Sequence, residues 1–190
     1  MRWMRKVLRG LRAAARRLAS RLRILWYRCL FEGFEAGAGV TIGRGAWINL
    51  PSGGRLVLGD RVHIGSGASL MAEGGTIEIG ADGFIGPGCT IVAFERVAIG
   101  RDALIAAFVT IRDQDHGFAR SDLPYRAQPL VSAPVEIGSN VWLGTHVTVT
   151  RGVTIGDGAI VGANSVVTSS LDGRTLSAGA PARTLRALDG

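Results

Sequence analysis

Residues 155–160 read Ile155-Gly156-Asp157-Gly158-Ala159-Ile160, and this six-residue unit decides the fold. An aliphatic residue begins the unit, a glycine usually follows it, and a small residue comes two places later. The unit recurs between Ile42 and Val167, for example as Ile64-Gly65-Ser66-Gly67-Ala68-Ser69. This spacing suits a short strand that turns one aliphatic and one small side chain inward, and the glycine permits a tight corner.

Repeats of so short a period predict a solenoid, in which each coil buries its inward row against its neighbours. Three units close one triangular coil, so about six coils are expected, starting near Ile42, Leu58, Ile79, Ile99, Ile137 and Ile155. At a strand spacing of about 4.8 Å they form a prism about 30 Å long. We therefore predict an all-β parallel solenoid over residues 37–178, after a helix and linker at 1–36. The C-terminal segment at 179–190 is expected to form a short helix after Pro181.

Positive charge is concentrated at the N-terminal end. Ten of the 22 basic residues lie in residues 1–31, which hold no acidic residue, and the remaining 12 face 15 acidic residues in the rest of the chain. Seven apolar residues in this segment step by three or four and form one stripe on a helix: Met4, Leu8, Leu11, Ala15, Leu18, Leu22 and Leu25. Such a basic amphipathic helix, with Trp3, Trp26 and Tyr27 near its ends, predicts binding of residues 1–31 to an anionic membrane surface.

Two other interpretations of this helix stay open. The stripe is also compatible with packing between subunits of an oligomer, and the Arg-rich segment with a targeting presequence. A transmembrane anchor or secretory signal is not expected, because the apolar run Ile24-Leu25-Trp26-Tyr27 ends at Arg28, far short of the ~20 residues that span a bilayer. We therefore expect a cytoplasmic location, peripheral at the inner face of the cell membrane.

The repeat is interrupted by an excursion over residues 113–134 and resumes in register at Val135. Long excursions from a regular scaffold are usually functional. This one opens with His116, and an imidazole titrates near neutral pH, as a general base must. Asp113 and Asp115 are close enough in sequence to orient the ring or stabilise its protonated form.

A larger set of motifs surrounds this loop. They are Asp113-x-Asp115-His116-Gly117, the segment Pro124–Arg126, Ala133-Pro134-Val135-x-Ile137-Gly138, Asn140-Val141-Trp142-Leu143-Gly144, Val161-Gly162-Ala163 and Gly179-x-Pro181-Ala182-Arg183. Together they resemble the maltose and galactoside O-acetyltransferases and their relatives that acetylate exopolysaccharides, over roughly residues 37–188. The resemblance implies a hexapeptide-repeat, left-handed parallel β-helix and a homotrimer. It also implies that acetyl-CoA lies in the groove between neighbouring prisms, at an active site shared across the interface.

The resemblance further implies roles for single residues. His116 is implied to take the proton from an acceptor hydroxyl as this attacks the thioester carbonyl, with Asp113 and Asp115 beside it. Tyr125 and Arg126 match the acceptor side of the site. The positions implied to bind acetyl-CoA are Trp142, Gly144, Thr145, Gly162, Ala163 and Thr168 along the groove and Arg183 and Arg186 at the CoA phosphates. Because the thioester is already activated, transfer needs no covalent enzyme intermediate.

Two departures from the family bear on substrate binding, one on CoA and one on the acceptor. Ser169 stands where relatives often carry Lys, which removes one contact to a CoA phosphate. The N-terminal capping segment of the soluble sugar acetyltransferases is replaced by the basic helix. We therefore expect the acceptor to be a sugar hydroxyl on a membrane-associated or lipid-linked glycan or surface polysaccharide, close to which the helix would hold the groove.

The same residues leave other functions to consider. An amino group or a serine is an alternative acceptor, and a non-catalytic scaffold is an alternative for the whole chain. A zinc enzyme on this solenoid would need clustered histidines, whereas His63, His116 and His146 include no close pair, so no metal is expected. Cys89, at a small inward repeat position, and Cys29, near the helix end, do not suit a nucleophile. Nucleic-acid binding is not expected, because the repeat body is acidic and shows no basic face interleaved with aromatics.

Overall fold

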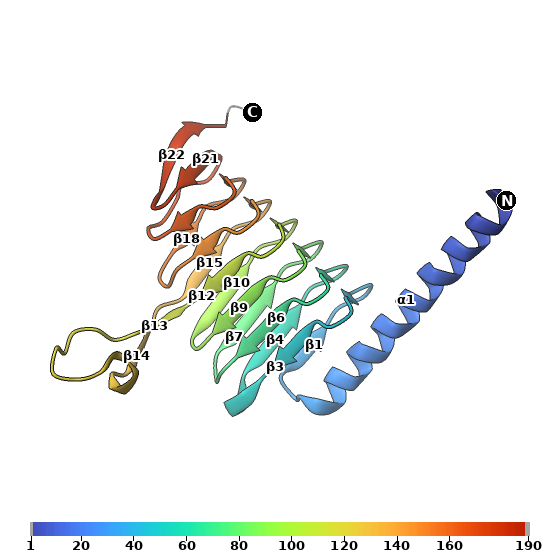
Figure 1. The fold of residues 1–190 in the computed structure, drawn as a ribbon, viewed down its shortest axis with the longest axis horizontal. Helices are drawn as coiled ribbons and strands as arrows, with labels where there is room; N and C mark the ends of the chain where they lie inside the picture. Colours follow the sequence, from blue (N-terminus) through green and yellow to red (C-terminus); the bar gives the residue numbers. More distant parts are fainter. Residues whose placement is uncertain (1, 189–190) are drawn as a thin grey trace.

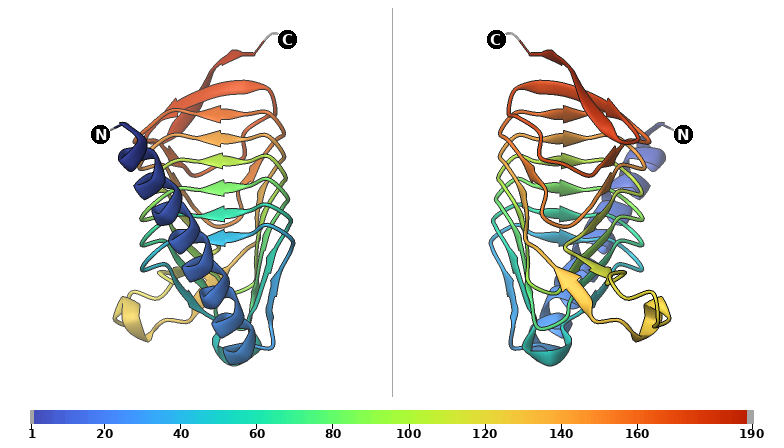
Figure 2. Two further views of the ribbon diagram at one scale, coloured as in Figure 1. Left: turned by 90° about the vertical axis from the view of Figure 1, so that its right-hand side faces the viewer. Right: turned by 90° about the vertical axis from the view of Figure 1, so that its left-hand side faces the viewer.

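The computed structural model describes residues 2–188 and, among residues 2–18, the side chains of 10, 11, 14, 15, 17 and 18. A long helix, α1 (Arg2–Leu30), precedes a three-walled prism of short parallel strands (Figure 1). The coils stack along the prism, and α1 lies across its N-terminal end, next to the first coil (Figures 1 and 2). The predicted left-handed parallel β-helix of about six coils is confirmed.

Three sheets form the walls, and the chain visits them in turn. Sheet A contains β1 (Phe34–Ala36), β4 (Arg55–Leu58), β7 (Thr76–Ile79), β10 (Arg96–Ile99), β15 (Val135–Ile137) and β18 (Thr154–Ile155). Sheet B contains β2 (Thr41–Ile42), β5 (His63–Ile64), β8 (Phe84–Ile85), β11 (Leu104–Ile105), β16 (Trp142–Leu143), β19 (Ile160–Val161), β21 (Thr175–Gly179) and β22 (Ala182–Ala187). Sheet C contains β3 (Trp47–Asn49), β6 (Ser69–Ala72), β9 (Thr90–Ala93), β12 (Thr110–Arg112), β17 (Thr148–Val149) and β20 (Val166–Val167).

The core is a set of aliphatic ladders, one from each wall. The first residues of successive repeat units are partners in the parallel register and are almost fully buried. In sheet B they are Ile42, Ile64, Ile85, Ile105, Leu143 and Val161. Each coil buries this row against its neighbours, and Tyr27 of α1 joins the core beside the first coil. The small inward residue Cys89 is buried as predicted, and its thiol donates a hydrogen bond to the Ala106 carbonyl at 3.0 Å.

Helix α1 covers the exposed edge of the first coil. Ser20 Oγ accepts a hydrogen bond from Ile42 N–H at 2.8 Å, and the Arg23 guanidinium donates two to the Ile42 carbonyl at 3.0 and 2.6 Å. The buried Tyr27 hydroxyl donates to the Ala46 carbonyl at 3.0 Å. Side chains of the helix thus satisfy main-chain groups that would otherwise form an open sheet edge. The linker is also shorter than expected, because strand β1 already begins at Phe34.

The C-terminal segment corrects one prediction. Residues 182–187 form strand β22, antiparallel to β21, rather than a helix. The chain reverses just after Gly179, whose φ of 108° lies in the region that favours glycine. The returning segment then meets the unpaired edge of β21, and main-chain pairing along that edge outweighs the helical preference of six residues. Consequently Arg183 and Arg186 do not share a helix face.

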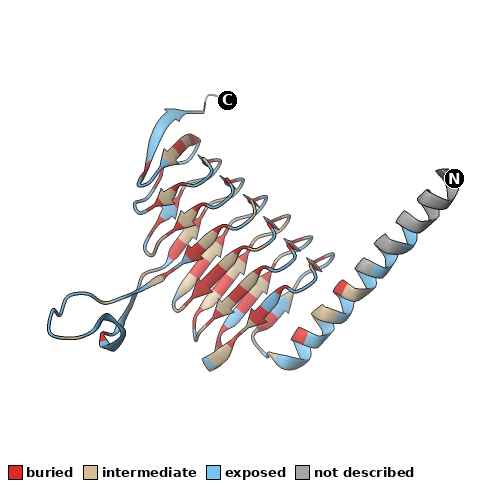
Figure 3. Ribbon diagram, viewed as in Figure 1, coloured by how far each residue is buried: buried red, intermediate tan, exposed pale blue. Residues whose placement is uncertain are grey.

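The described leucines of the α1 stripe face away from the prism, whereas Ala15 of the same stripe lines a cavity between α1 and sheet B. Leu11, Leu18, Leu22 and Leu25 are exposed, whereas Ser20 and Tyr27 on the other side of the helix are buried. Figure 3 shows the described part of α1 mostly exposed, with a few buried positions. The stripe positions Met4 and Leu8, and also Trp3, lie outside the described side chains. Among residues 2–188, no helix has an apolar stretch long enough to cross a bilayer.

Candidate active site

The excursion leaves the prism at the corner between sheets C and A. Strands β13 (Gln114–His116) and β14 (Leu130–Ser132) pair antiparallel to form its base, and a short 3₁₀ turn, Tyr125–Ala127, lies near its tip. The loop stands out from the side of the prism, away from α1 (Figure 1). His116 ends the first strand of this hairpin, and its side chain is exposed. The imidazole is therefore accessible to a substrate.

Asp113 has a different position from the one predicted for it. Its carboxylate is fully buried and accepts four hydrogen bonds, at 2.7 to 3.0 Å, from the main-chain N–H groups of Phe94, Glu95 and Arg96. Its own carbonyl accepts a bond from Ala133 N–H at 2.8 Å. Asp113 therefore ties both ends of the loop to the neighbouring corner, and its carboxylate does not orient His116.

Asp115 also has another partner. Its carboxylate accepts a hydrogen bond from the Arg151 guanidinium at 3.1 Å, which joins the loop to the next coil. Among the hydrogen bonds of residues 2–188, none involves the His116 side chain. Within one chain, both aspartates considered as partners of His116 thus bond other groups.

Sequence reasoning missed Gln128, which holds the loop together. Gln128 is buried, its amide accepts a hydrogen bond from Arg120 N–H, and it donates to the carbonyls of Arg120 and Leu123 at 2.8 and 3.2 Å. Tyr125 and Arg126, predicted to contact the acceptor, are exposed on the 3₁₀ turn. A buried glutamine inside a polar loop leaves no mark in the sequence, because its partners are main-chain groups.

Four residues predicted to bind acetyl-CoA lie together at the corner between sheets B and C. Gly144 and Thr145 follow β16, and Gly162 and Ala163 follow β19 one coil later. A Cβ atom at Gly144 would lie 2.6 Å from the Ala163 nitrogen, so only glycine allows the coils to stack so closely here. Thr145 and Ala163 are exposed. Trp142, whose side chain is 47% exposed, points outward from sheet B just before this corner.

Strand β22 brings the two arginines to the C-terminal end of sheet B. Arg183 is paired with Ala178 and Arg186 with Leu176. Ala178 in turn lies over Gly162, since a Cβ at Gly162 would be 3.1 Å from the Ala178 Cβ. Both arginines are exposed, and their guanidinium groups donate hydrogen bonds to the main-chain carbonyls of Ala182 and Ala187. Arg183 thus follows Gly144 and Gly162 along the stack, next to the strand that covers Gly162.

The predicted residues occupy two different corners of the triangle. His116 and its loop lie between sheets C and A, whereas Gly144, Thr145 and Gly162 lie between sheets B and C. Thr168, which follows β20 in sheet C, is near the loop's corner and apart from the other acetyl-CoA positions. One chain therefore does not assemble the predicted base and the predicted acetyl-CoA groove at one place.

The corner between sheets B and C carries a second feature that sequence reasoning missed. The left-handed turn position is glycine in the early coils, but Phe108, His146 and Asn164 hold it in the later ones, with φ of 58°, 62° and 59°. The rings of Phe108 and His146 are in contact, with centroids 5.1 Å apart. His and Asn adopt this conformation more readily than other residues, whereas Phe108 is a bulky residue for which it is unfavourable. The same conformation recurs elsewhere in the solenoid, for example at Arg61, Asp82 and Asp102. The loss of glycine at these repeat positions is visible in the sequence.

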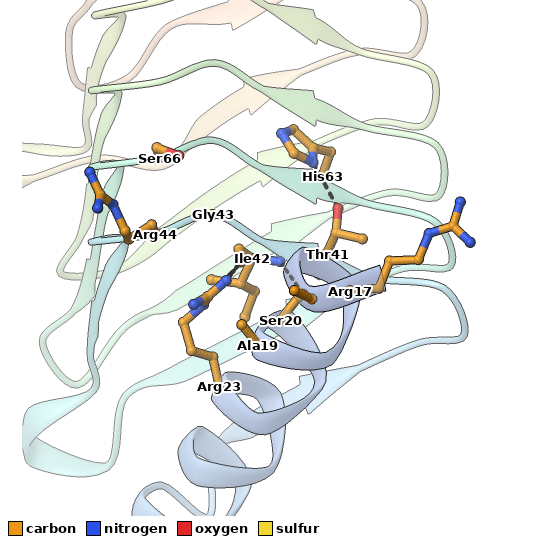
Figure 4. A pocket seen from close by; sticks show the side chains of 11 residues that line it. Arg17, Ala19, Ser20, Arg23, Thr41, Ile42, Gly43, Arg44, His63 and Ser66 are labelled. Carbon is orange, nitrogen blue, oxygen red and sulfur yellow. Dashed lines mark hydrogen bonds between the residues drawn. The ribbon is translucent and has the colours of Figure 1, made fainter. Parts of the chain in front are cut away.

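The cavities lie away from the predicted residues. One of about 920 Å³ opens to solvent between α1 and sheet B, where Arg23, Ser20, Thr41 and His63 are among the residues that line it (Figure 4). A second, of about 470 Å³, is lined by residues that include Asn140 and Arg174. The predicted acetyl-CoA groove lies between neighbouring prisms, so a single chain would contribute only one wall of it.

The histidines are dispersed. His63 lies on β5, where its Nδ1 is 2.7 Å from the Thr41 hydroxyl, His146 lies at the corner between sheets B and C, and His116 is on the loop. In the described part of the chain, no group of three or more His, Cys, Asp or Glu side chains could hold a metal ion. Burial raises the pKa of the Cys89 thiol, which keeps it protonated and disfavours it as a nucleophile.

Comparisons with known proteins agree with this architecture. Residues 134–169 match the family model described as bacterial transferase hexapeptide (six repeats). The chain is 40% identical over 141 residues to the putative lipopolysaccharide biosynthesis O-acetyl transferase WbbJ of Escherichia coli, which covers 70% of this chain and 72% of that protein. It is 32% identical over 148 residues to a probable acetyltransferase of Mycobacterium tuberculosis, covering 77% of this chain but 49%, about half, of that longer relative.

A solved structure extends the likeness to the whole fold. A hexapeptide-repeat acetyltransferase of Vibrio cholerae, complexed with acetyl coenzyme A, superimposes with a TM-score of 0.61. Its sequence is 26% identical, and the match covers 88% of this chain and 77% of that one. The repeat, the β-helix, the excursion loop and the extent of the match to WbbJ lead to one assignment: the chain belongs to the hexapeptide-repeat acyltransferases.

Proposed function

We propose that this protein transfers an acetyl group from acetyl-CoA to a hydroxyl group of a sugar, with His116 as the general base. Relatives whose names describe O-acetyl transfer and lipopolysaccharide biosynthesis support the class of reaction and of acceptor. The structural observation that carries the proposal is the exposed imidazole of His116, on a loop that Asp113 and Gln128 hold in place. Its exposure leaves room for an acceptor hydroxyl within hydrogen-bond distance.

The reaction is a direct transfer. As the acceptor oxygen attacks the thioester carbonyl carbon, its proton passes to the free nitrogen of the His116 imidazole. Main-chain N–H groups at the groove would stabilise the negative charge that develops on the carbonyl oxygen. The tetrahedral intermediate then collapses, the carbon–sulfur bond breaks, and the CoA thiolate takes the proton from the imidazolium. No enzyme nucleophile takes part, which is compatible with the burial of Cys89.

We propose that a homotrimer forms the complete site. The loop of one chain would meet the corner between sheets B and C of its neighbour, bringing His116 to the residues proposed for acetyl-CoA. Two sheets differ in a way that supports side-by-side packing. Sheet B exposes an apolar row in register, Phe84, Leu104 and Trp142, whereas sheet A exposes an ion-pair ladder in which Arg96 bonds Glu78 and Glu136.

We further propose that the acceptor sugar belongs to a membrane-associated glycan or surface polysaccharide and that the protein works peripherally at the inner membrane face. The support is the charge distribution of the chain, in which the N-terminal helix holds ten basic residues and no acidic one up to residue 31. A helix resting on an anionic membrane would hold the groove close to such an acceptor.

The test is the release of CoA thiol from acetyl-CoA, with a membrane extract that contains lipid-linked glycans as acceptor. Acceptor-dependent release should fall by about 10²-fold or more in His116→Ala, the scale expected for loss of a general base. His63→Gln, a histidine variant on sheet B, serves as the matched control and should retain activity. If release persists in His116→Ala, His116 is not the base; if acetyl-CoA does not bind at all, the acetyltransferase proposal fails.

The acceptor class is tested by the product. Acetylation of a sugar hydroxyl yields an ester that mild base removes, whereas acetylation of an amino group yields an amide that resists it. With acetyl-CoA labelled in its acetyl group, we expect mild base to remove the label from the product. A base-stable product would assign an amino acceptor instead.

A further inference from the structure

The outer surface of α1 is apolar on the side that points away from the protein. Leu11, Leu18, Leu22 and Leu25 are between 55% and 62% exposed, and Trp26 beside them is 58% exposed. Soluble monomers rarely expose so many large apolar side chains in one row, and such rows mark interaction surfaces. The row lies on a helix that is already held on the prism by its other side.

Helix geometry places this row opposite the docked face. At about 100° per residue, Leu18 and Leu22 lie about 200° around the helix from Ser20, which bonds the first coil. Leu25 likewise lies about 200° around the helix from the buried Tyr27. Because α1 lies across the N-terminal end of the prism (Figures 1 and 3), we conclude from this helix geometry that the leucine row faces outward from that end.

Arginines flank the row on one side. Arg17 and Arg21 are exposed and lie about 60° and 100° around the helix from Ser20, between the docked face and the leucines. Arg17 is the nearer to the docked face and also lines the open cavity between α1 and sheet B. Side chains at this boundary can keep the guanidinium at the headgroup level while the stem covers apolar surface. Trp26 lies on the opposite flank, and its ring suits the same interfacial depth.

We infer that this face of α1, defined by Leu11, Leu18, Leu22, Leu25 and its flanking Arg17 and Arg21, binds the surface of an anionic lipid bilayer. Charge complementarity selects this occupant, since helix residues up to 31 include no acid and anionic headgroups attract the arginines. Because α1 lies across the end of the prism, the coils would stack away from the membrane, with β21 and β22 at the far end. The inference rests on the membrane location proposed above and assigns the face of α1 that makes the contact. It uses no residue of the proposed acetyl-transfer site, so vesicle binding and acetyl transfer can fail separately.

A second copy of the chain is the competing occupant. Prisms packed side by side, as the apolar row of sheet B favours, bring walls together and leave the ends free. The leucine row lies at the end, where such an assembly would not cover it. End-to-end association of two assemblies would cover it, but it would also bring two arginine flanks of like charge together.

The test is cosedimentation of the full-length protein with vesicles of phosphatidylcholine, with and without phosphatidylglycerol. The protein should bind the anionic vesicles, and Leu18→Ser/Leu22→Ser should lower the partition coefficient by about tenfold or more, as removal of interfacial apolar groups predicts. Arg17→Gln/Arg21→Gln should lower it by about fivefold for each charge at low salt, and the difference should vanish at high salt.

Leu185→Ser is the matched control, because Leu185 is an equally exposed leucine on β22 at the far end of the prism. It should bind vesicles like the wild type. Circular dichroism should report an unchanged fold for all variants, since each removes an exposed side chain. Absence of binding by the wild type, or equal binding by the leucine double variant, would overturn the inference. A fall in molar mass of that variant in light scattering, without vesicle binding, would assign the row to self-association.

The native cysteines provide an independent readout. Cys29 is exposed and lies about 200° around the helix from Tyr27, on the leucine side, whereas Cys89 is buried. A polarity-sensitive fluorophore on Cys29 should shift to the blue with anionic vesicles. An unchanged spectrum during cosedimentation would show that another surface binds the lipid.

Discussion

Asp113 directs a single carboxylate to three consecutive main-chain N–H groups, and this contact anchors the loop that carries His116. Asp113→Asn would place amide N–H donors against those same N–H groups. We expect the free energy of unfolding to fall by about 1–3 kcal/mol, the cost of buried unsatisfied donors. Urea denaturation measures it. Asp122→Asn in the same loop, which removes only an exposed pair with Arg120, should leave stability unchanged.

His63 makes stability depend on pH. Its ring is stacked on Phe84, with centroids 5.0 Å apart, and burial lowers its pKa. A lowered pKa means that the folded state disfavours the protonated ring, so stability is lost as pH falls below about 6.5, the pKa of an unfolded histidine. The midpoint of thermal unfolding should therefore rise between pH 5 and 7 in the wild type. The rise should be smaller in His63→Gln. If the unfolding midpoints of the two proteins change equally with pH, His63 is not the group responsible.

At the scale of elements, β22 is a strand where the sequence predicted a helix. It carries Arg183 and Arg186, the two proposed ligands of CoA phosphates. Arg183→Ala/Arg186→Ala should raise KM for acetyl-CoA by about tenfold or more, as loss of charge-assisted hydrogen bonds predicts. Thermal stability should not change, because both side chains are exposed. With acetyl-pantetheine, which lacks the distal phosphates, the KM of the double variant should equal that of the wild type. An equal loss with both donors would show that the arginines act on the fold of β22 instead.

The helix and the loop differ in how far the sequence predicts them. The position of α1 and the apolar stripe follow from spacing alone, since three- and four-residue steps need no knowledge of the rest of the chain. The docked face does not, because Ser20, Arg23 and Tyr27 acquire partners only when the first coil closes. In the loop, the sequence located His116 and the limits of the excursion, but not the roles of Asp113 and Gln128, whose partners are main-chain atoms.

At the scale of the molecule, the proposed base and the proposed acetyl-CoA residues lie at different corners of the prism. Two inactive variants should therefore complement each other. His116→Ala lacks the base, and Thr145→Trp would fill the groove at an exposed position. Mixed trimers, formed by dissociation and reassembly, should regain up to about a quarter of wild-type activity, the statistical share of interfaces with both intact parts. No recovery in verified mixed assemblies would place the whole site within one chain.

The six-residue period by itself determined the prism, its coil number and the inward ladders, because each anchor packs only on its counterpart one coil away and the pattern is therefore local. The tertiary structure alone decided the rest. It turned residues 182–187 into a strand by offering the open edge of β21, and it directed the Asp113 carboxylate to the N–H groups of residues 94–96. It also separated His116 from Gly144 and Thr145 by one wall of the triangle. Each of these outcomes depends on groups far apart in the chain, whose meeting no local pattern encodes.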